Sequence, residues 1–333
     1  MKKILGFLTL LIIIFIIGFY FWAKAPLVKQ SDYSNIKVNS NYHPIAIQDT
    51  FTVITYNIGY LSGMTNNLPV ARSEELFKTN LAKAKQLFNQ EEPSIITFQE
   101  IDFHSARSYY INQFNELLGQ GAFPFGAYVV NWDKRYVPFP YWPIRYHFGE
   151  MLSGQALLSS SRILSNERLV LPKPENNPFY YNDFYLDRLV QLAWIQSVKD
   201  SILIMNVHLE AYDAKTREIQ VDLVLNYFKK YEDSYPILLM GDFNCAPPYS
   251  NSQYQEKTIE KLLDYPRISS AINKDQYLTK SENYKTFSSR NPEDKIDFIF
   301  YNNKYLNCID ATVLNSAGEI SDHLPVKAVL VMK

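Results

Sequence analysis

Short polar clusters follow several apolar stretches of this sequence, and their side chains have the chemistry needed to handle a phosphate ester. The polar residues at these positions are Asn57, Gln99, Glu100, His208, Asp242, Asn244, Asp297, Asp322 and His323. Carboxylate and amide oxygens are ligands that Mg²⁺ prefers, and a carboxylate can take a proton from water. Amide and imidazolium groups can stabilise charge that develops on phosphate oxygens. The residue types therefore fit a metal-assisted attack of water on phosphorus.

Each cluster has an ordinary structural explanation when it is taken alone. A Glu after a strand is commonly a solvated side chain, and Asp-x-Asn after Gly is a common turn sequence. The repeated position at the ends of apolar stretches favours one shared site instead. The remaining histidines, His43, His104 and His147, have no such position, and we interpret them as surface or loop residues.

Alternating strand and helix patterns separate these clusters. Period-two or buried apolar patterns predict strands over 51–58, 94–99, 192–198, 201–209, 236–243, 295–301 and 324–332. Helical spacing predicts helices over 74–88, 105–118, 214–231 and 254–264, with Ser73 as the N-cap of the first. Lys199-Asp200 separates two of the strands and predicts a hairpin. The stretch 123–150 is dense in aromatic residues and proline, and it is interpreted as an elaborate loop.

The motifs in this order resemble the endonuclease/exonuclease/phosphatase family, which includes deoxyribonucleases, apurinic endonucleases, inositol polyphosphate 5-phosphatases and neutral sphingomyelinases. The resemblance rests on TYNIG (55–59), TFQEID (97–102), NVHLEA (206–211), MGDFNCAPP (240–248), KIDFIF (295–300) and SDHLPV (321–326), and it covers about residues 50–333. It implies a four-layer α/β sandwich, in which two mostly antiparallel sheets face each other and helices lie outside. It also implies a Mg²⁺-dependent phosphodiesterase, with Mn²⁺ as a possible substitute.

The resemblance also implies a role for each matching residue. Glu100 matches the metal carboxylate, Asn57 the neighbouring amide that helps hold metal and phosphate, and Asp322 a carboxylate near the metal. Asp242 matches the residue that deprotonates the attacking water, and Asn244 its hydrogen-bonding neighbour. His323 matches the histidine on the scissile phosphate, Asp297 the carboxylate that orients it, and His208 a histidine at the phosphate or leaving group.

The N-terminal segment has the length and composition of a membrane-spanning helix. Residues 4–22 carry no charge and rise roughly 28 Å as a helix, about one hydrocarbon core. Lys2 and Lys3 favour a cytoplasmic N-terminus, which places the remainder outside the cytoplasmic membrane. The alternative is a signal peptide cleaved after Ala25, but Pro26 is an unfavourable residue after such a cut. We expect residues 1–25 to be a single-pass anchor, 26–48 a tether and 49–333 the catalytic domain of a monomer.

The amino-acid composition and the net charge limit the kinds of partner that this protein is expected to bind. The apolar fraction of 47% and the charged fraction of 20% are those of a globular protein. The formal charge is −1, and removing Lys2, Lys3 and Lys24 leaves 30 basic and 34 acidic residues, a charge of −4. Proteins that bind the phosphate backbone of DNA usually carry an excess of basic residues, so the net charge does not favour nucleic acid as a partner. The two cysteines, Cys245 and Cys308, cannot build a disulfide framework.

The motifs define the substrate class less specifically than they define the family. The inositol 5-phosphatase branch usually has WxGDxNxR, whereas Met240 precedes Gly241 here and Cys245 follows Asn244. A membrane anchor, a neutral-to-acidic domain and the aromatic segment 123–148 favour a lipid headgroup or another small phosphodiester. An extracytoplasmic nuclease is the alternative, and a degenerate binding module is a third hypothesis. The aromatic segment has a second interpretation as a structural plug.

Overall fold

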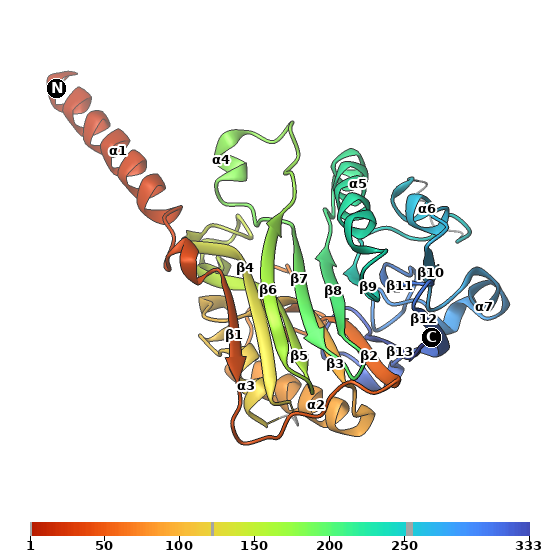
Figure 1. Cartoon of the computed structure of the whole chain (residues 1–333). Helices are drawn as coiled ribbons and strands as arrows, with labels where there is room; N and C mark the ends of the chain where they lie inside the picture. Colours follow the sequence, from red (N-terminus) through yellow and green to blue (C-terminus); the bar gives the residue numbers. More distant parts are fainter. Residues whose placement is uncertain (1, 121–122, 251–255) are drawn as a thin grey trace.

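The computed structural model describes residues 2–120, 123–250 and 256–333, and its strands form two sheets that pack face to face (Figure 1). One sheet has the strand order β1-β4-β5-β3-β2-β13-β12, and the other has β10-β11-β9-β8-β7-β6. Among the described strands, β2 pairs with β3 and β8 with β9 in parallel, and the other neighbours are antiparallel. The strand bounds are β1 Ser34–Val38, β2 Thr50–Asn57, β3 Ile95–Asp102, β4 Phe125–Val137, β5 Gly149–Ser159, β6 Ile163–Val170, β7 Leu189–Gln196, β8 Ser201–His208, β9 Ile237–Asp242, β10 Ile268–Ser270, β11 Asp297–Asn302, β12 Leu306–Val313 and β13 Val326–Met332.

Helices cover the outer face of each sheet. The side chain of Ser73 caps α2 (Glu74–Glu91), as the sequence predicts, and Phe88 of this helix packs on Phe98 of β3 with ring centroids 5.5 Å apart. On the other sheet α5 (Ala214–Tyr231) buries Phe228, and its Tyr231 packs on Trp194 of β7. The two sheets and two helical layers form the four-layer α/β sandwich expected from the sequence, so the fold class is confirmed. The other helices are α3 Gln113–Gln120, α4 Phe179–Asn182, α6 Thr258–Leu263 and α7 Lys274–Thr279.

Buried amide side chains join the two sheets where the polar clusters begin. The Nε2 atom of Gln99 on β3 donates to Oδ1 of Asn206 on β8 at 2.6 Å, and Nδ2 of Asn206 donates to Oε1 of Gln191 on β7 at 3.0 Å. All three side chains are fully buried, and such groups are stable only when paired. Glu100 follows Gln99 directly and His208 lies two residues after Asn206, so this network fixes the distance between their strands.

The N-terminal helix α1 (Lys2–Ala23) extends away from the sandwich and is exposed along its apolar length (Figure 1). It is long and apolar enough to span a membrane. The chain is joined to the domain just after the helix ends, because the amide of Arg135 donates to the carbonyl of Ala25 at 3.0 Å. The helix therefore leaves the domain at a defined place.

Two segments differ from the sequence interpretation. Residues 34–38, inside the expected tether, form β1 and pair with β4 as an edge strand, so this part of the segment belongs to the first sheet. The stretch 123–150 is also not one loop, because β4 forms a long antiparallel ladder with β5. Register shifts between Val130 and Trp132 and between Lys134 and Val137 break the period-two pattern, which explains why the strand is hard to recognise.

The helix expected over 105–118 is shorter than its pattern suggests. Residues 106–108 form a single 3-10 turn, and α3 begins only at Gln113. Tyr109 and Tyr110 adopt positive φ angles of 58° and 59°, which interrupt the helix. The helix expected over 254–264 is α6, which begins at Thr258, and residues 254 and 255 of that range lie outside the described residues.

Candidate active site

The strand register brings three predicted side chains into one row. His208 is the last residue of β8 and lies opposite Asp242, the last residue of β9. Asp242 in turn lies opposite Asp297, the first residue of β11. On the facing sheet Asn57 ends β2, and Glu100 lies in a bulge of β3 with φ at 52°. Positive φ is uncommon for Glu, and strained backbone of this kind is often found at functional sites.

Asn57 joins the two sheets at the centre of the site. Its Nδ2 atom lies 2.9 Å from Oδ2 of Asp242, 3.3 Å from Oε1 of Glu100 and 3.4 Å from Nε2 of His323. The Asn57 carbonyl accepts a hydrogen bond from Oγ of Ser321 at 2.8 Å, which ties the loop before β13 to the end of β2. The predicted residues from four separate motifs therefore meet around one fully buried amide.

Glu100 and Asp322 form the more open part of the site. Both carboxylates lie 3.2 Å from Nδ2 of Asn66, and the Glu100 side chain keeps 20% of its surface exposed. Burial raises the pKa of Asp322, the charge of His323 opposes this effect, and the charge of Glu100 adds to it. Asn66 was not expected from the sequence. It lies in a loop after Gly59 without any pattern, so only the tertiary fold reveals its position.

Asp242 is placed to exchange a proton near neutral pH. Burial raises its pKa to about 7, and the charges of His323 and Asp297 act in opposite directions on it. The Asn57 amide and the backbone amide of Asn244, at 2.8 Å, both donate to its carboxylate. The Asn244 side chain donates to the carbonyl of Leu209 at 3.0 Å, and this residue has a φ of 50°. Asn244 therefore lies beside Asp242, as the motif suggests.

His323 and Asp297 form a buried pair. The Nδ1 atom of His323 lies 2.9 Å from Oδ2 of Asp297, and Nε2 faces Asp242 at 3.8 Å from Oδ2. Burial alone lowers the pKa of His323, but the carboxylates of Asp297 and Asp242 outweigh it and raise that pKa well above its usual value. Phe287 covers the imidazole, with ring centroids 5.0 Å apart. This environment favours the charged form of the imidazole, whose Nε2 faces Asp242.

His208 has the opposite electrostatic environment. Nη1 of Arg188 donates to its Nε2 at 2.7 Å, and burial, then the charges of Arg188 and His323, lower the pKa of His208 well below its usual value. The same Nε2 lies 3.4 Å from Oδ2 of Asp242 and 3.9 Å from Oε1 of Glu100. Although these distances resemble ion pairs, a neutral His208 that accepts from Arg188 explains them better.

Arg188 belongs to a buried cluster that the sequence did not reveal. Its Nε atom lies 3.5 Å from Oε2 of Glu210, and its Nη2 donates to the hydroxyl of Tyr185 at 3.3 Å. The Tyr185 hydroxyl donates to Oε1 of Glu210 at 2.8 Å. Glu210 was part of the NVHLEA motif, but an Arg at the start of an apolar strand gave no signal. The cluster places a fixed positive charge beside His208.

Two groups of side chains offer ligands for a cation. The carboxylates of Glu100 and Asp322 both accept from the Asn66 amide, and Glu100 also lies 3.3 Å from Nδ2 of Asn57. The second group is Asp242, Asp297 and His323, whose possible ligand atoms lie within 4.8 Å of one another. In the second group Nδ1 of His323 is already engaged with Asp297. The oxygen donors and partial exposure of the first group fit Mg²⁺ better, because that ion usually retains several waters.

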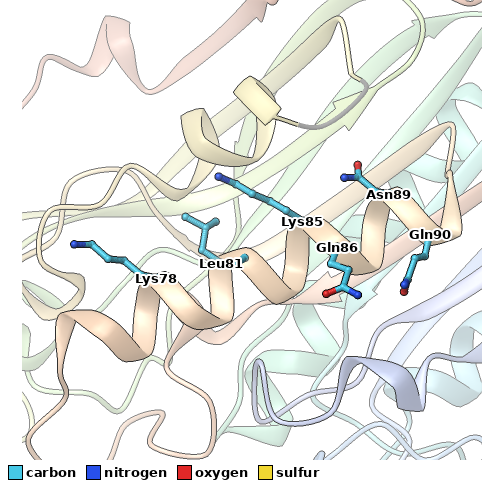
Figure 2. Close-up of a pocket in the computed structure, with 7 residues that line it drawn as sticks. Lys78, Leu81, Lys85, Gln86, Asn89 and Gln90 are labelled. Carbon is cyan, nitrogen blue, oxygen red and sulfur yellow. The ribbon is translucent and has the colours of Figure 1, made fainter.

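A surface hollow along α2 has none of these features. Side chains of Lys78, Leu81, Lys85, Gln86, Asn89 and Gln90 line it on one face of the helix (Figure 2). It contains no carboxylate or imidazole and none of the residues around Asn57. We therefore place the chemistry at the ends of the strands.

Comparisons with known proteins identify the family of the chain and agree with its fold. The profile described as "Endonuclease/Exonuclease/phosphatase family" matches residues 54–323. An endonuclease/exonuclease/phosphatase from Beutenbergia cavernae superposes with a TM-score of 0.62 at 17% identity, covering 85% of this chain and 72% of that one. The human Nocturnin catalytic domain with bound sulfate has a TM-score of 0.58 at 17% identity, covering 93% and 99%. A Bacteroides thetaiotaomicron mannosyl-6-phosphatase has a TM-score of 0.56 at 17% identity, covering 84% and 99%. No curated protein sequence matches.

Proposed function

Because the chain belongs to the endonuclease/exonuclease/phosphatase family, whose members hydrolyse phosphoester bonds, we propose that it is a Mg²⁺-dependent phosphodiesterase. The observation that carries this proposal is the convergence of Glu100, Asp242 and His323 on the amide of Asn57. Among the similar structures, one is titled a phosphatase and another holds a sulfate anion, which resembles phosphate in shape. These relatives support phosphate chemistry in this fold.

Each residue of the candidate site has a separate role in the proposed hydrolysis. Glu100, Asn57 and Asp322 would hold the divalent ion, which when bound would offset negative charge on a phosphate oxygen. Asp242 accepts a proton from water, whose oxygen then forms a bond to phosphorus while the bond to the leaving oxygen breaks. Nε2–H of His323 donates to the phosphate as its charge increases. Asp297 holds the imidazole in that orientation and keeps it charged.

We propose that the substrate is a lipid headgroup or another small phosphodiester. The apolar helix α1 supports this choice, as does the charge of −4 without its three flanking lysines. An extracytoplasmic nuclease and a non-catalytic binding module are the other outcomes of the test below.

We also propose that α1 is a retained single-pass anchor, with the catalytic domain on the extracytoplasmic side. The contacts of Lys24 with Asp183, at 2.9 Å, and of Ala25 with Arg135 support retention, because a cut after Ala25 would break them. Mass spectrometry of the membrane fraction tests this directly. A mature N-terminus at Pro26 would show that the segment is a cleaved signal peptide.

The activity test uses the full-length protein in detergent with Mg²⁺. Candidate substrates are sphingomyelin, phosphoinositides, nucleotides, duplex DNA and an artificial phosphodiester. We expect hydrolysis of a phosphodiester that excess chelator abolishes and that Mg²⁺ or Mn²⁺ restores. Glu100→Gln should lose activity, whereas Glu91→Gln, which removes only an ion pair between α2 and Lys327, should not. Full activity in excess chelator, or in Glu100→Gln, would contradict the proposal.

A further inference from the structure

The end of α1 is packed against the domain through aromatic side chains. Phe19 and Trp22 lie against Tyr136 of β4, with ring centroids 5.6 and 6.5 Å apart. Tyr20 lies against Phe184 at 5.8 Å, and its hydroxyl donates to Asp183. These contacts fix which part of the domain lies beside the end of the helix.

Two exposed aromatic segments adjoin these contacts, and we call them together the aromatic rim. The first is 139–146, in which Tyr141, Trp142 and Ile144 are 62%, 74% and 60% exposed. The second is α4, in which Phe179 and Tyr180 are 73% and 57% exposed. Large apolar side chains that are exposed next to one another usually mark an interaction surface.

Hydrogen bonds and ring contacts connect the rim to α1. The ring of Tyr136 contacts Phe19 and Trp22, and its hydroxyl lies 2.7 Å from Nδ1 of His147. Nε2 of His147 in turn lies 3.2 Å from the carbonyl of Tyr141. On the other side, α4 ends at Asn182, immediately before the two residues that contact Tyr20. The rim is therefore held at the level of the last turns of the helix.

That level corresponds to a bilayer surface if α1 spans the membrane. The apolar run ends at Ala23, so Phe19 and Trp22 lie within roughly 6 Å of its end. Trp and Tyr side chains are favoured at the depth of lipid headgroups. Residues 134–148 also contain Lys134, Arg135 and Arg145 and no acidic residue, and Asp183 beside α4 is paired with Lys24, so this surface complements anionic lipid.

We propose that the aromatic rim lies in the headgroup layer of the same bilayer that α1 spans. This inference rests on the proposed anchor, but not on which phosphoester is cleaved. Tyr181 of α4 packs on Tyr185 with ring centroids 5.4 Å apart, and the Tyr185 hydroxyl accepts from Arg188, which contacts His208 in the candidate active site. The rim therefore places one side of the active site next to the membrane surface, where a lipid headgroup can reach it.

Tryptophan fluorescence of the full-length protein in vesicles tests the rim. Vesicles of phosphatidylcholine and phosphatidylglycerol contain lipid brominated near the headgroup as the quencher. The difference in emission between wild type and Trp142→Phe isolates Trp142, and we expect roughly twofold quenching of that component because the ring lies at the interface. The matched control is Trp194→Phe, because Trp194 packs on Tyr231 of α5 and should show no quenching.

A second variant and a flotation assay separate the possible failures. Phe179→Trp in the Trp142→Phe background places a reporter on α4, and its emission should also be quenched. Protein that floats with the vesicles while both reporters remain unquenched keeps the anchor and overturns the rim. Protein that does not float overturns the anchor and the rim with it. Neither result alters the metal dependence measured with a soluble phosphodiester, so failure of the proposed chemistry remains distinguishable.

Discussion

At the scale of single residues, the two site histidines face one carboxylate, and their surroundings shift their pKa values in opposite directions. Nε2 of His208 lies 3.4 Å from Oδ2 of Asp242, and Nε2 of His323 lies 3.8 Å from the same atom. Asp297 favours the charged form of His323, whereas burial and Arg188 favour the neutral form of His208. The difference in neighbours therefore assigns different work to two chemically identical side chains.

The pair of Asp297 and His323 should act as one unit. Asp297→Asn should keep the fold and lower turnover, because an amide can hold the ring without supplying charge. His323→Ala should cost more, about 10²–10³-fold, because the donor itself is lost. The double variant should match His323→Ala within experimental error when kcat is measured. Fully additive losses would mean that the pair does not function together.

Arg188 should be required for turnover although it is absent from the recognised motifs. Arg188→Met keeps most of the side-chain volume but removes the charge beside His208, and we expect kcat/KM to fall about 10²-fold. The control is Arg168→Met on β6, because Arg168 pairs with Asp187 at 2.6 Å and does not contact His208. Thermal melting must show that the variant is folded at the assay temperature. A folded Arg188→Met enzyme with wild-type activity would exclude this role.

The sequence motifs predicted the residues at the centre of the site, but not the residues that contact them. Glu100, Asp242 and His323 stand in short patterns next to strand ends, so their proximity could be inferred before the structure was known. Asn66 and Arg188 have no such pattern, because a loop amide and an Arg beside a strand look like ordinary surface residues. Only the pairing of distant segments brings them to Glu100 and His208.

At the scale of elements, the site depends on how closely β8 and β9 approach. Gly241 precedes Asp242 with φ at 143°, and a Cβ atom there would lie 2.0 Å from the carbonyl oxygen of Val207. No side chain can be accommodated without moving one strand. The parallel pair that carries His208 and Asp242 therefore requires glycine at this position.

Gly241→Ala should both destabilise the protein and impair the site. We expect a loss of about 2–4 kcal/mol in the free energy of unfolding, from the clash and the unfavourable φ. Activity of the fraction that remains folded should fall as well, because Asp242 moves with the strand. The control is Gly119→Ala in α3, where nothing lies within 4 Å of the new Cβ and alanine favours the helix. Chemical denaturation measures both variants, and equal stabilities would contradict the prediction.

The elements also differ in how well the sequence predicts them. The helix α5 coincides with its expected range 214–231, because its apolar face repeats at helical spacing. By contrast, β1 contains only Ile36 and Val38 as large apolar residues and lies at a sheet edge, so its pattern resembles a loop. Such strands are specified by their partner, here β4, and not by their own sequence.

At the scale of the whole molecule, charge argues against polymeric nucleic acid as the substrate. The formal charge is −1, and it is −4 without Lys2, Lys3 and Lys24. The basic residues Lys134, Arg135 and Arg145 lie beside the aromatic rim, where the bilayer surface is proposed to lie. The domain therefore lacks the overall basic excess that usually accompanies duplex binding.

Full-length protein in detergent should consequently bind duplex DNA weakly. At physiological salt we expect no saturation below about 10 µM, because few phosphates can be neutralised. Each phosphate contact contributes about −0.9 to the slope of log K against log salt, so the slope should be shallow. If residual DNA binding takes place at the aromatic rim, the double variant Arg135→Glu with Arg145→Glu should abolish it. Hydrolysis of a soluble phosphodiester should remain unchanged in this variant. Tight binding with a slope steeper than about −5 would favour a nuclease instead, since such a slope requires six or more phosphate contacts.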